Sequence, residues 1–221
     1  MKTSVTSVLG TAALLAIGAS AQAATITVPG DSIGGGQLVG TTFTIGMEGF
    51  NGGQNNWPGN EAPAAAIDAN SATKYLNFAE LNAGYIVTPT AGLSIVTGAE
   101  FTTANDAPER DPLTFTLYGS NSEIAGNTPG LTFSLTDFTL IATGSTGLAT
   151  DPGRFVTAPP VTFPNVAPYT TYLLVFPTVR NEAAANSVQI AEAILTGRVV
   201  PEPSALLFAG LAGVGFLRRR R

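Results

Sequence analysis

The chain has 221 residues and contains neither cysteine nor histidine. Disulfides and thiol chemistry are therefore excluded, as are histidine general bases and histidine or cysteine metal ligands. Between residues 24 and 200, 14 acidic side chains outnumber five basic ones. Such a balance repels nucleic acid and suits hard cations.

The first 23 residues have the three-part layout of a cleavable signal peptide. Lys2 precedes an apolar helix centred on residues 8–17, and the small residues Ala21 and Ala23 flank Gln22. We expect signal peptidase to cut after Ala23. The alternative, a membrane anchor, needs about 20 apolar residues. This run is shorter and contains Ser and Thr.

Residues 24–199 are expected to form one all-β domain. Short runs rich in β-branched and aromatic residues recur between Gly, Asn, Asp and Pro, and residues 171–176 are apolar on both faces, as in a central strand. Strands are expected at residues 41–45, 84–88, 94–103, 113–118, 132–142, 155–163, 171–176 and 188–196. Their number and spacing predict a two-sheet sandwich or jelly roll, with glycine-rich loops at residues 34–36 and 49–53.

Residues 55–78 are expected to be a strand-poor loop ahead of the sheet. Within six residues this loop offers the carboxylate of Asp68, the amide of Asn70, the hydroxyl of Thr73 and free carbonyls. Such a loop can curl around Ca²⁺, which takes about six to eight oxygen ligands. The same residue types also form ordinary turns by bonding their own backbone, and both interpretations stand at this point.

Three stretches of the domain resemble the discoidin or coagulation-factor type C family. They are AIDANSATKY at 66–75, PLTFTLYGSN at 112–121 and VQIAEAILTG at 188–197. The resemblance implies a galactose-binding-like jelly roll with a structural calcium. By this resemblance, the residues that hold the calcium are Asp68, Asn70, Thr73, Ala191 and Glu192.

The chain departs from that family at two positions. Ala69 stands where the family usually has Gly, and Tyr75 stands where it often has Trp. If the position of Ala69 needs a positive φ, an alanine there strains the loop. For Glu192, the alternative is an ion pair with Arg198 or Lys74.

Residues 103–112 crowd four charged side chains into one loop, among them Asp106 and Arg110. Arg110 can hold sugar hydroxyls through its planar guanidinium while Asp106 accepts from them, and Trp57 is a candidate for sugar stacking. The alternative, which the sequence favours, is that Arg110 neutralises its acidic neighbours and ties the loop. Glu109 and Asp111 are disfavoured as a glycosidase pair, because such carboxyls lie about 5 to 10 Å apart across a cleft.

Residues 200–221 resemble the PEP-CTERM sorting signal of Gram-negative bacteria. A proline-flanked carboxylate, which favours extended backbone, precedes a short apolar helix at 205–217 and an arginine cluster that stays cytoplasmic. The resemblance implies transient membrane contact and cutting near the Pro-Glu-Pro by an exosortase-type protease; the alternative is an ordinary tail anchor. The residues concerned are Pro201, Glu202, Pro203, Arg218, Arg219, Arg220 and Arg221.

Together these features predict an exported, non-catalytic protein of the cell surface or extracellular matrix. Its sandwich is expected to bind carbohydrate, such as exopolysaccharide, or another matrix component, and to have no nucleic-acid partner. A purely structural matrix or spacer protein without a small ligand is the alternative. A polysaccharide-acting enzyme is disfavoured, because the chain lacks histidine and a recognisable carboxylate pair.

Overall fold

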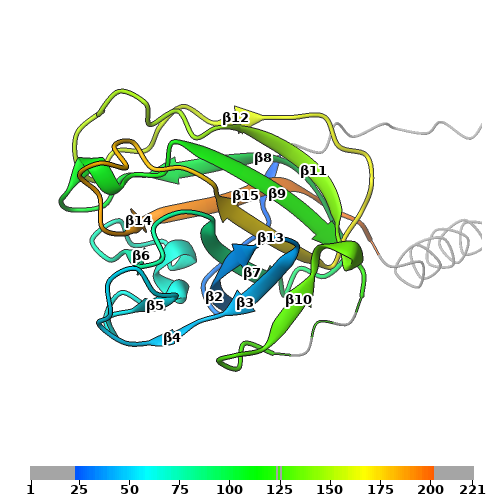
Figure 1. Cartoon of the computed structure of the whole chain (residues 1–221). Coiled ribbons are helices and arrows are strands. Elements are labelled where there is room, and N and C mark those ends of the chain that lie inside the picture. The colour runs from blue at the N-terminus through cyan, green and yellow to red at the C-terminus, as the bar shows by residue number, and fades with distance from the viewer. Residues whose placement is uncertain (1–22, 123, 125, 202–221) are drawn as a thin grey trace, which may run out of the picture.

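The computed structural model describes residues 23–122, 124 and 126–201, which form a β-sandwich (Figure 1). This architecture confirms the all-β sandwich predicted from the sequence. The signal peptide before Ala23, the tail after Pro201 and the helices expected in both lie outside the described residues. Among the residues described, no helix is long and apolar enough to cross a membrane.

The larger sheet has seven antiparallel strands. In spatial order they are β10 (Thr132–Ser134), β3 (Thr42–Ile45), β2 (Ser32–Val39), β7 (Ala83–Thr88), β13 (Thr171–Phe176), β9 (Thr114–Ser120) and β11 (Thr139–Ser145). Every residue of β13 is buried, which confirms the central strand predicted at 171–176. Tyr172, Leu174 and Phe176 belong to the main core, whereas Leu173 and Val175 belong to a second apolar cluster.

The smaller sheet has four strands and encloses the main core against the larger one. Its order is β1 (Ala24–Thr25), β15 (Glu192–Val199), β8 (Ser94–Thr102) and β12 (Val161–Thr162). Phe101 of this sheet lies 5.4 Å from Phe115 and 6.2 Å from Phe176, measured between ring centroids. These aromatic contacts join the two layers.

Short elements cover one end of the sandwich. Two small sheets pair β4 (Met47–Glu48) with β5 (Asn56–Trp57) and β6 (Tyr75–Asn77) with β14 (Val188–Ile190). Two 3-10 helices, η1 (Pro63–Ile67) and η2 (Pro108–Arg110), complete this set, and a third, η3 (Leu135–Asp137), connects β10 to β11 elsewhere in the domain. The first two helices and both small sheets belong to the segments that form the sites described below.

Three strand predictions were wrong in their extent. Residues 132–142 form β10 and β11 on opposite edges of the larger sheet, because the Ser134 side chain accepts a bond from the Thr136 N–H and caps η3 between them. Of residues 155–163 only β12 is a strand, since Phe155 has a φ of 60° and Pro159 and Pro160 lack the N–H that a ladder needs. Residues 188–196 bend at Ala191 and divide into β14 and β15.

The glycine-rich stretch 34–36 was predicted to be a loop but lies inside β2. A Cβ at Gly35 would collide with Pro63 and Tyr75, and one at Gly36 would collide with Phe43. Glycine is therefore required here by close packing of this strand against its neighbours rather than by a turn.

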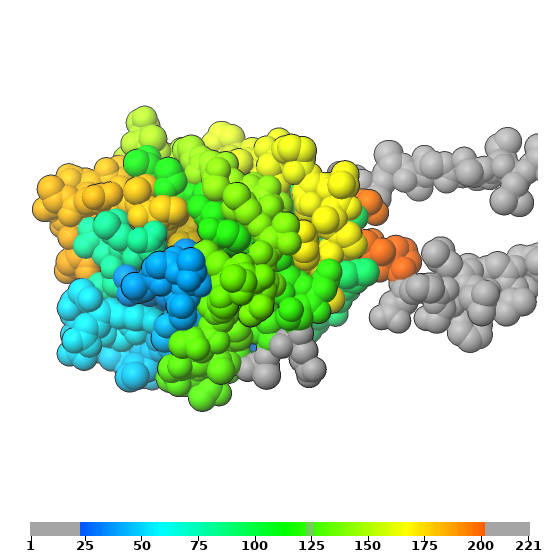
Figure 2. All heavy atoms as spheres, turned by 45° about the vertical axis from the view of Figure 1, so that its right-hand side comes forward, coloured from blue at the N-terminus to red at the C-terminus, as the bar shows by residue number. Residues whose placement is uncertain are grey.

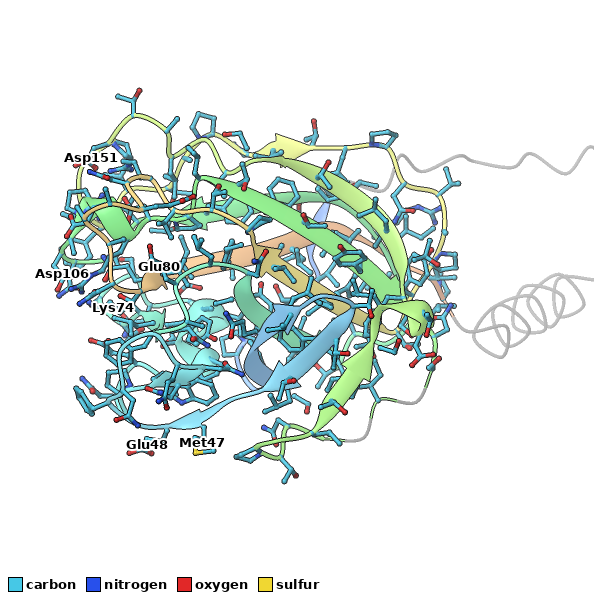
Figure 3. The ribbon with its side chains drawn as sticks, viewed as in Figure 1. Met47, Glu48, Lys74, Glu80, Asp106 and Asp151 are labelled. Atoms are coloured by element: carbon cyan, nitrogen blue, oxygen red, sulfur yellow. The ribbon has the colours of Figure 1, made fainter. Side chains whose placement is uncertain are left out.

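The two termini of the domain lie at the same end of the sandwich. Ala24 pairs with Gly197 near the C-terminal end of β15, and the Val200 N–H donates a 2.8 Å bond to the Leu93 carbonyl. Figure 2 shows the C-terminal residues (orange-red) far from the segment around residue 50 (cyan). Lys74 and Asp106 likewise lie at the end away from the termini (Figure 3).

Candidate functional site

A tight loop at residues 68–73 is closed by its own polar side chains. Oδ1 of Asp68 accepts a 2.9 Å bond from the Asn70 N–H, and the Thr73 hydroxyl lies 2.7 Å from both Oδ2 of Asp68 and the Asn70 carbonyl. Ala69, between them, has a φ of 60°. The position at which the family that this loop resembles usually has glycine therefore does adopt the left-handed conformation. We call residues 68–73 the carboxylate loop.

Glu192, the first residue of β15, lies against this loop although it is 122 residues further along the chain than Asn70. Its Oε1 accepts a 2.6 Å bond from the Asn70 N–H, while its Oε2 is buried without a partner among the described residues. The residue is 7% exposed. Burial, followed by the neighbouring Asp68 carboxylate, raises the pKa of Glu192 to about 7, against the backbone bond from Asn70. The alternative ion pair with Arg198 or Lys74 is not formed.

Four of the five residues expected to hold calcium thus meet in space. Ala191, the fifth, is buried beside Glu192, and its N–H bonds to the Thr102 carbonyl. Only two carboxylates contribute, and nowhere in the described part of the chain do three or more metal-binding acidic side chains gather. A cation here would draw its other ligands from hydroxyl and carbonyl oxygens, which are donors that a hard cation prefers.

A pocket of about 360 Å³ opens beside the carboxylate loop. We call it the end pocket, because it lies among the short elements at the end opposite the termini. Its wall combines apolar side chains with polar and charged ones. The apolar residues are Phe50, Pro58, Leu76 and Phe78, and the polar residues are Asn60, Glu61, Lys74, Asp106 and Arg110.

Buried Lys74 organises the charged wall of the end pocket. Its ammonium donates to Oδ1 of Asp106 at 2.7 Å and to the Gln189 side-chain oxygen at 3.0 Å, and it lies 3.6 Å from Glu61. Partial burial acts to raise the pKa of Asp106, but the hydrogen bond and charge of Lys74 outweigh it and hold that pKa below its usual value. Asp106 is therefore an ionised acceptor at neutral pH.

An exposed aromatic side chain stands at the rim of the pocket. Phe50 is 77% exposed and lies 6.1 Å from Phe78, between ring centroids. Trp57, the stacking candidate named from the sequence, is only 9% exposed and packs edge-on against Tyr75 in the core. The sequence analysis missed Phe50, although an aromatic residue within the glycine-rich loop at 49–53 was a usable signal.

Arg110 does not neutralise Asp111, contrary to the interpretation favoured from the sequence. Asp111 is fully buried, and its Oδ2 is held by Arg154 at 2.6 Å and by Arg180 at 2.8 Å. This burial also removes Asp111 from any exposed catalytic pair with Glu109. The Arg110 guanidinium makes no hydrogen bond or ion pair with any residue of the described ranges, and its Nε is shielded from solvent.

A second, larger groove of about 530 Å³ is lined in part by Glu192 and by Ala69 and Ser71 of the carboxylate loop. Threonine hydroxyls line it together with Glu100 and the half-exposed Phe155. No basic side chain contributes to its wall. The end pocket is thus the one of these two hollows that offers cationic donors beside an aromatic ring.

Comparison with solved structures finds similar folds among family 32 carbohydrate-binding modules. The module from Clostridium perfringens NanJ, solved in complex with galactose, is 13% identical, with 79% of this chain and 99% of that chain covered and a TM-score of 0.49. The module from Streptococcus pneumoniae EndoD is 12% identical, covering 79% and 100%, also at 0.49. The first two such domains of C. perfringens ZmpB are 18% identical, covering 67% and 34%, at 0.47. At these identities and scores, no ligand is carried over to this chain.

The two ends of the chain were assigned to processing from the sequence. Ala23 and Pro201 are exposed, whereas Glu202, Pro203 and the four C-terminal arginines lie outside the described residues. No curated protein matches the chain. Residues 199–221 match the model described as the PEP-CTERM protein-sorting motif. This match confirms the assignment of the tail: the chain ends in a PEP-CTERM sorting signal, which implies export to the cell surface or the extracellular space.

Proposed function

We propose that this chain is a non-catalytic, carbohydrate-binding protein of the cell surface or extracellular matrix, and that it binds sugar in the end pocket. The observation that supports this most directly is the exposed Phe50 ring beside hydrogen-bonding side chains. A sugar ring has an apolar C–H face and a rim of hydroxyls. An aromatic platform with a few placed donors and acceptors is complementary to both.

The polar groups around Phe50 supply both kinds of hydrogen-bonding partner. Asp106 is half-exposed and ionised, so its carboxylate accepts from hydroxyls, and Arg110 and Asn60 donate to them. Lys74 is occupied by protein partners and fixes Asp106 in place. The pocket is therefore organised before a ligand arrives, which reduces the entropy lost on binding.

We also propose that the carboxylate loop holds a structural Ca²⁺. Asp68, Asn70, Thr73, Ala191 and Glu192 would supply its oxygens. The buried Oε2 of Glu192 supports this, since an unpaired carboxylate oxygen is costly and a cation satisfies it. When bound, the ion would supply positive charge that holds the loop against β15.

The carbohydrate proposal is tested with the processed protein recovered from culture medium. We expect it to bind a subset of a glycan array, and Phe50→Ala to lower affinity by about tenfold or more. Phe155→Ala is the matched control, because Phe155 is also a partly exposed phenylalanine but lines the other groove. Uniformly flat binding would contradict the proposal and favour a purely structural role.

Processing by an exosortase-type protease is part of the same proposal, supported by the match at residues 199–221. Intact mass of the exported protein reports both cleavages at once. We expect the mass of a polypeptide that begins at Ala24 and ends near Pro201–Pro203. Recovery of a chain that retains the C-terminal arginines would contradict this step.

A further inference from the structure

One positive charge in the end pocket has no counter-charge in contact with it. Lys74 holds Asp106 at 2.7 Å and Glu61 at 3.6 Å, so these three groups form one ion cluster with a net charge of −1. The four charged side chains of the pocket sum to zero. Arg110 is the member that touches no carboxylate, although its charge helps to lower the pKa of Asp106 from a distance, after the larger effects of burial, Lys74 and Gln189.

Two other arginines, unlike Arg110, contact carboxylates, although each of them also has a buried nitrogen without a hydrogen-bond partner among the described residues. Arg154 donates to both oxygens of Asp111 and to Asp151, and Arg180 lies against the same two carboxylates. These residues tie the domain's own loops together. Arg110 lies on η2 at the pocket wall, and its Nε is desolvated without an acceptor. A buried N–H that lacks a partner is unfavourable, and an arriving acceptor would relieve it.

The guanidinium group has a preferred partner. Its planar fork matches the two oxygens of a carboxylate, and such charge-assisted pairs are stronger than bonds to neutral hydroxyls. Phe50 and Phe78 line the same pocket and offer an apolar surface to a ring. A ligand that satisfies both features carries a carboxylate on a sugar ring.

We propose that the end pocket selects an acidic sugar of the uronic-acid type, with its carboxylate on Arg110 and its ring against Phe50. This inference rests on the proposed carbohydrate binding and adds the class of sugar. It also explains why a pocket in an acidic domain keeps an unpaired guanidinium. The pairing of the Arg110 guanidinium with the carboxylate of the sugar, rather than the overall charge of −5 on the chain, then determines which sugar binds.

The test compares each acidic sugar with a ligand that differs only in charge. Calorimetric titrations would use oligomers of galacturonic, glucuronic and mannuronic acid and the methyl ester of each. We expect at least one acid to bind about tenfold or more tightly than its ester. Arg110→Gln should bring that ratio close to one, and Arg110→Lys should restore only part of it, because lysine keeps the charge but loses the fork.

Arg198→Gln is the matched control, because Arg198 is an exposed arginine near the terminal end of β15, and it should keep the full ratio. The melting temperature of Arg110→Gln should stay close to that of the parent, since the guanidinium makes no hydrogen bond or ion pair with the described residues that the substitution would remove. Phe50-dependent binding that is equal for acids and esters, or unchanged by Arg110→Gln, would overturn the acidic-sugar inference and leave the proposed function standing. An absence of Phe50-dependent binding to any glycan would overturn both.

Discussion

The backbone N–H of Asn70 donates a 2.6 Å hydrogen bond to Oε1 of Glu192, 122 residues further along the chain. This bond joins the carboxylate loop to the start of β15. Lys74 follows the loop directly, and Gln189, just ahead of β15, bonds both Lys74 and the Asp106 carbonyl. The proposed cation site and the end pocket are therefore built on the same two segments, so order in one is expected to support the other.

Calcium is expected to stabilise the folded protein. At a free concentration of 100 times Kd, a ligand that binds only the folded state adds about 2.7 kcal/mol, or roughly 5 to 10 °C in Tm. Calorimetry in CaCl₂ and in chelator measures this difference. Glu192→Gln should abolish it, whereas Asp137→Asn, which removes an exposed carboxylate elsewhere, should preserve it. Identical melting in both solutions would remove the site.

Replacing Ala69 by glycine should stabilise the chain. A non-glycine residue at a φ of 60° costs about 1 to 2 kcal/mol, part of which is offset by the greater freedom of glycine when unfolded. We expect a net gain of about 0.5 to 1 kcal/mol in urea unfolding. Ala72→Gly, in the same loop but without a positive φ, should lose stability. A loss for both variants would contradict the strain at Ala69.

The ion pair of Asp106 and Lys74 should give stability that depends on pH. Because the folded protein lowers the pKa of Asp106 from 3.8, the unfolded chain takes up its proton first as the pH falls. The contribution is therefore complete above about pH 3.8 and is lost below it, through the folded-state pKa. The difference in unfolding free energy between the parent and Asp106→Asn should be constant from pH 7 to 5 and shrink below 3.8. A difference that grows in acid would contradict this sign.

Asp111 is expected to be the most costly carboxylate to neutralise. Asp111→Asn would remove the buried carboxylate that Arg154 and Arg180 share and leave these two largely buried arginines with only the exposed Asp151. Breaking such a buried pair costs about 3 to 5 kcal/mol, measurable by urea unfolding. Asp151→Asn is the control, and it should cost much less because Asp151 is solvent-exposed. Equal losses of unfolding free energy for the two variants would show that Asp111 contributes no more to stability than the exposed Asp151.

The features that were predicted correctly from the sequence depend on residues that are close together in the chain. The buried pattern of β13 follows from its run of apolar residues. The Asp68, Asn70 and Thr73 contacts follow from their spacing within one loop. The need for positive φ at residue 69 was anticipated from a family resemblance. Each of these features is set by residues near one another in sequence, where backbone geometry leaves few alternatives.

The features that the sequence did not predict depend on contacts between residues that are far apart in the chain. Asp111 pairs with Arg154, which is 43 residues away in the sequence. Arg110 therefore does not neutralise Asp111, although the sequence had led us to expect that it would. A tryptophan such as Trp57 can lie either at the rim of a binding site or in the core of a domain. In the structure Trp57 packs against Tyr75 in the core. The glycines of β2 looked like a loop because the neighbours that require them, such as Pro63, lie in another element.

The pairing of Ala24 with Gly197 places both ends of the domain on the side opposite the end pocket. The proposed cleavages after Ala23 and near Pro201 would lie about one strand length from the Lys74 and Asp106 end, which is about 25 Å for the eight residues of β15. Membrane-anchored and released forms would therefore both leave the end pocket accessible. A form that is still held in the membrane by its C-terminal tail would have the end pocket on the side of the domain away from the tail.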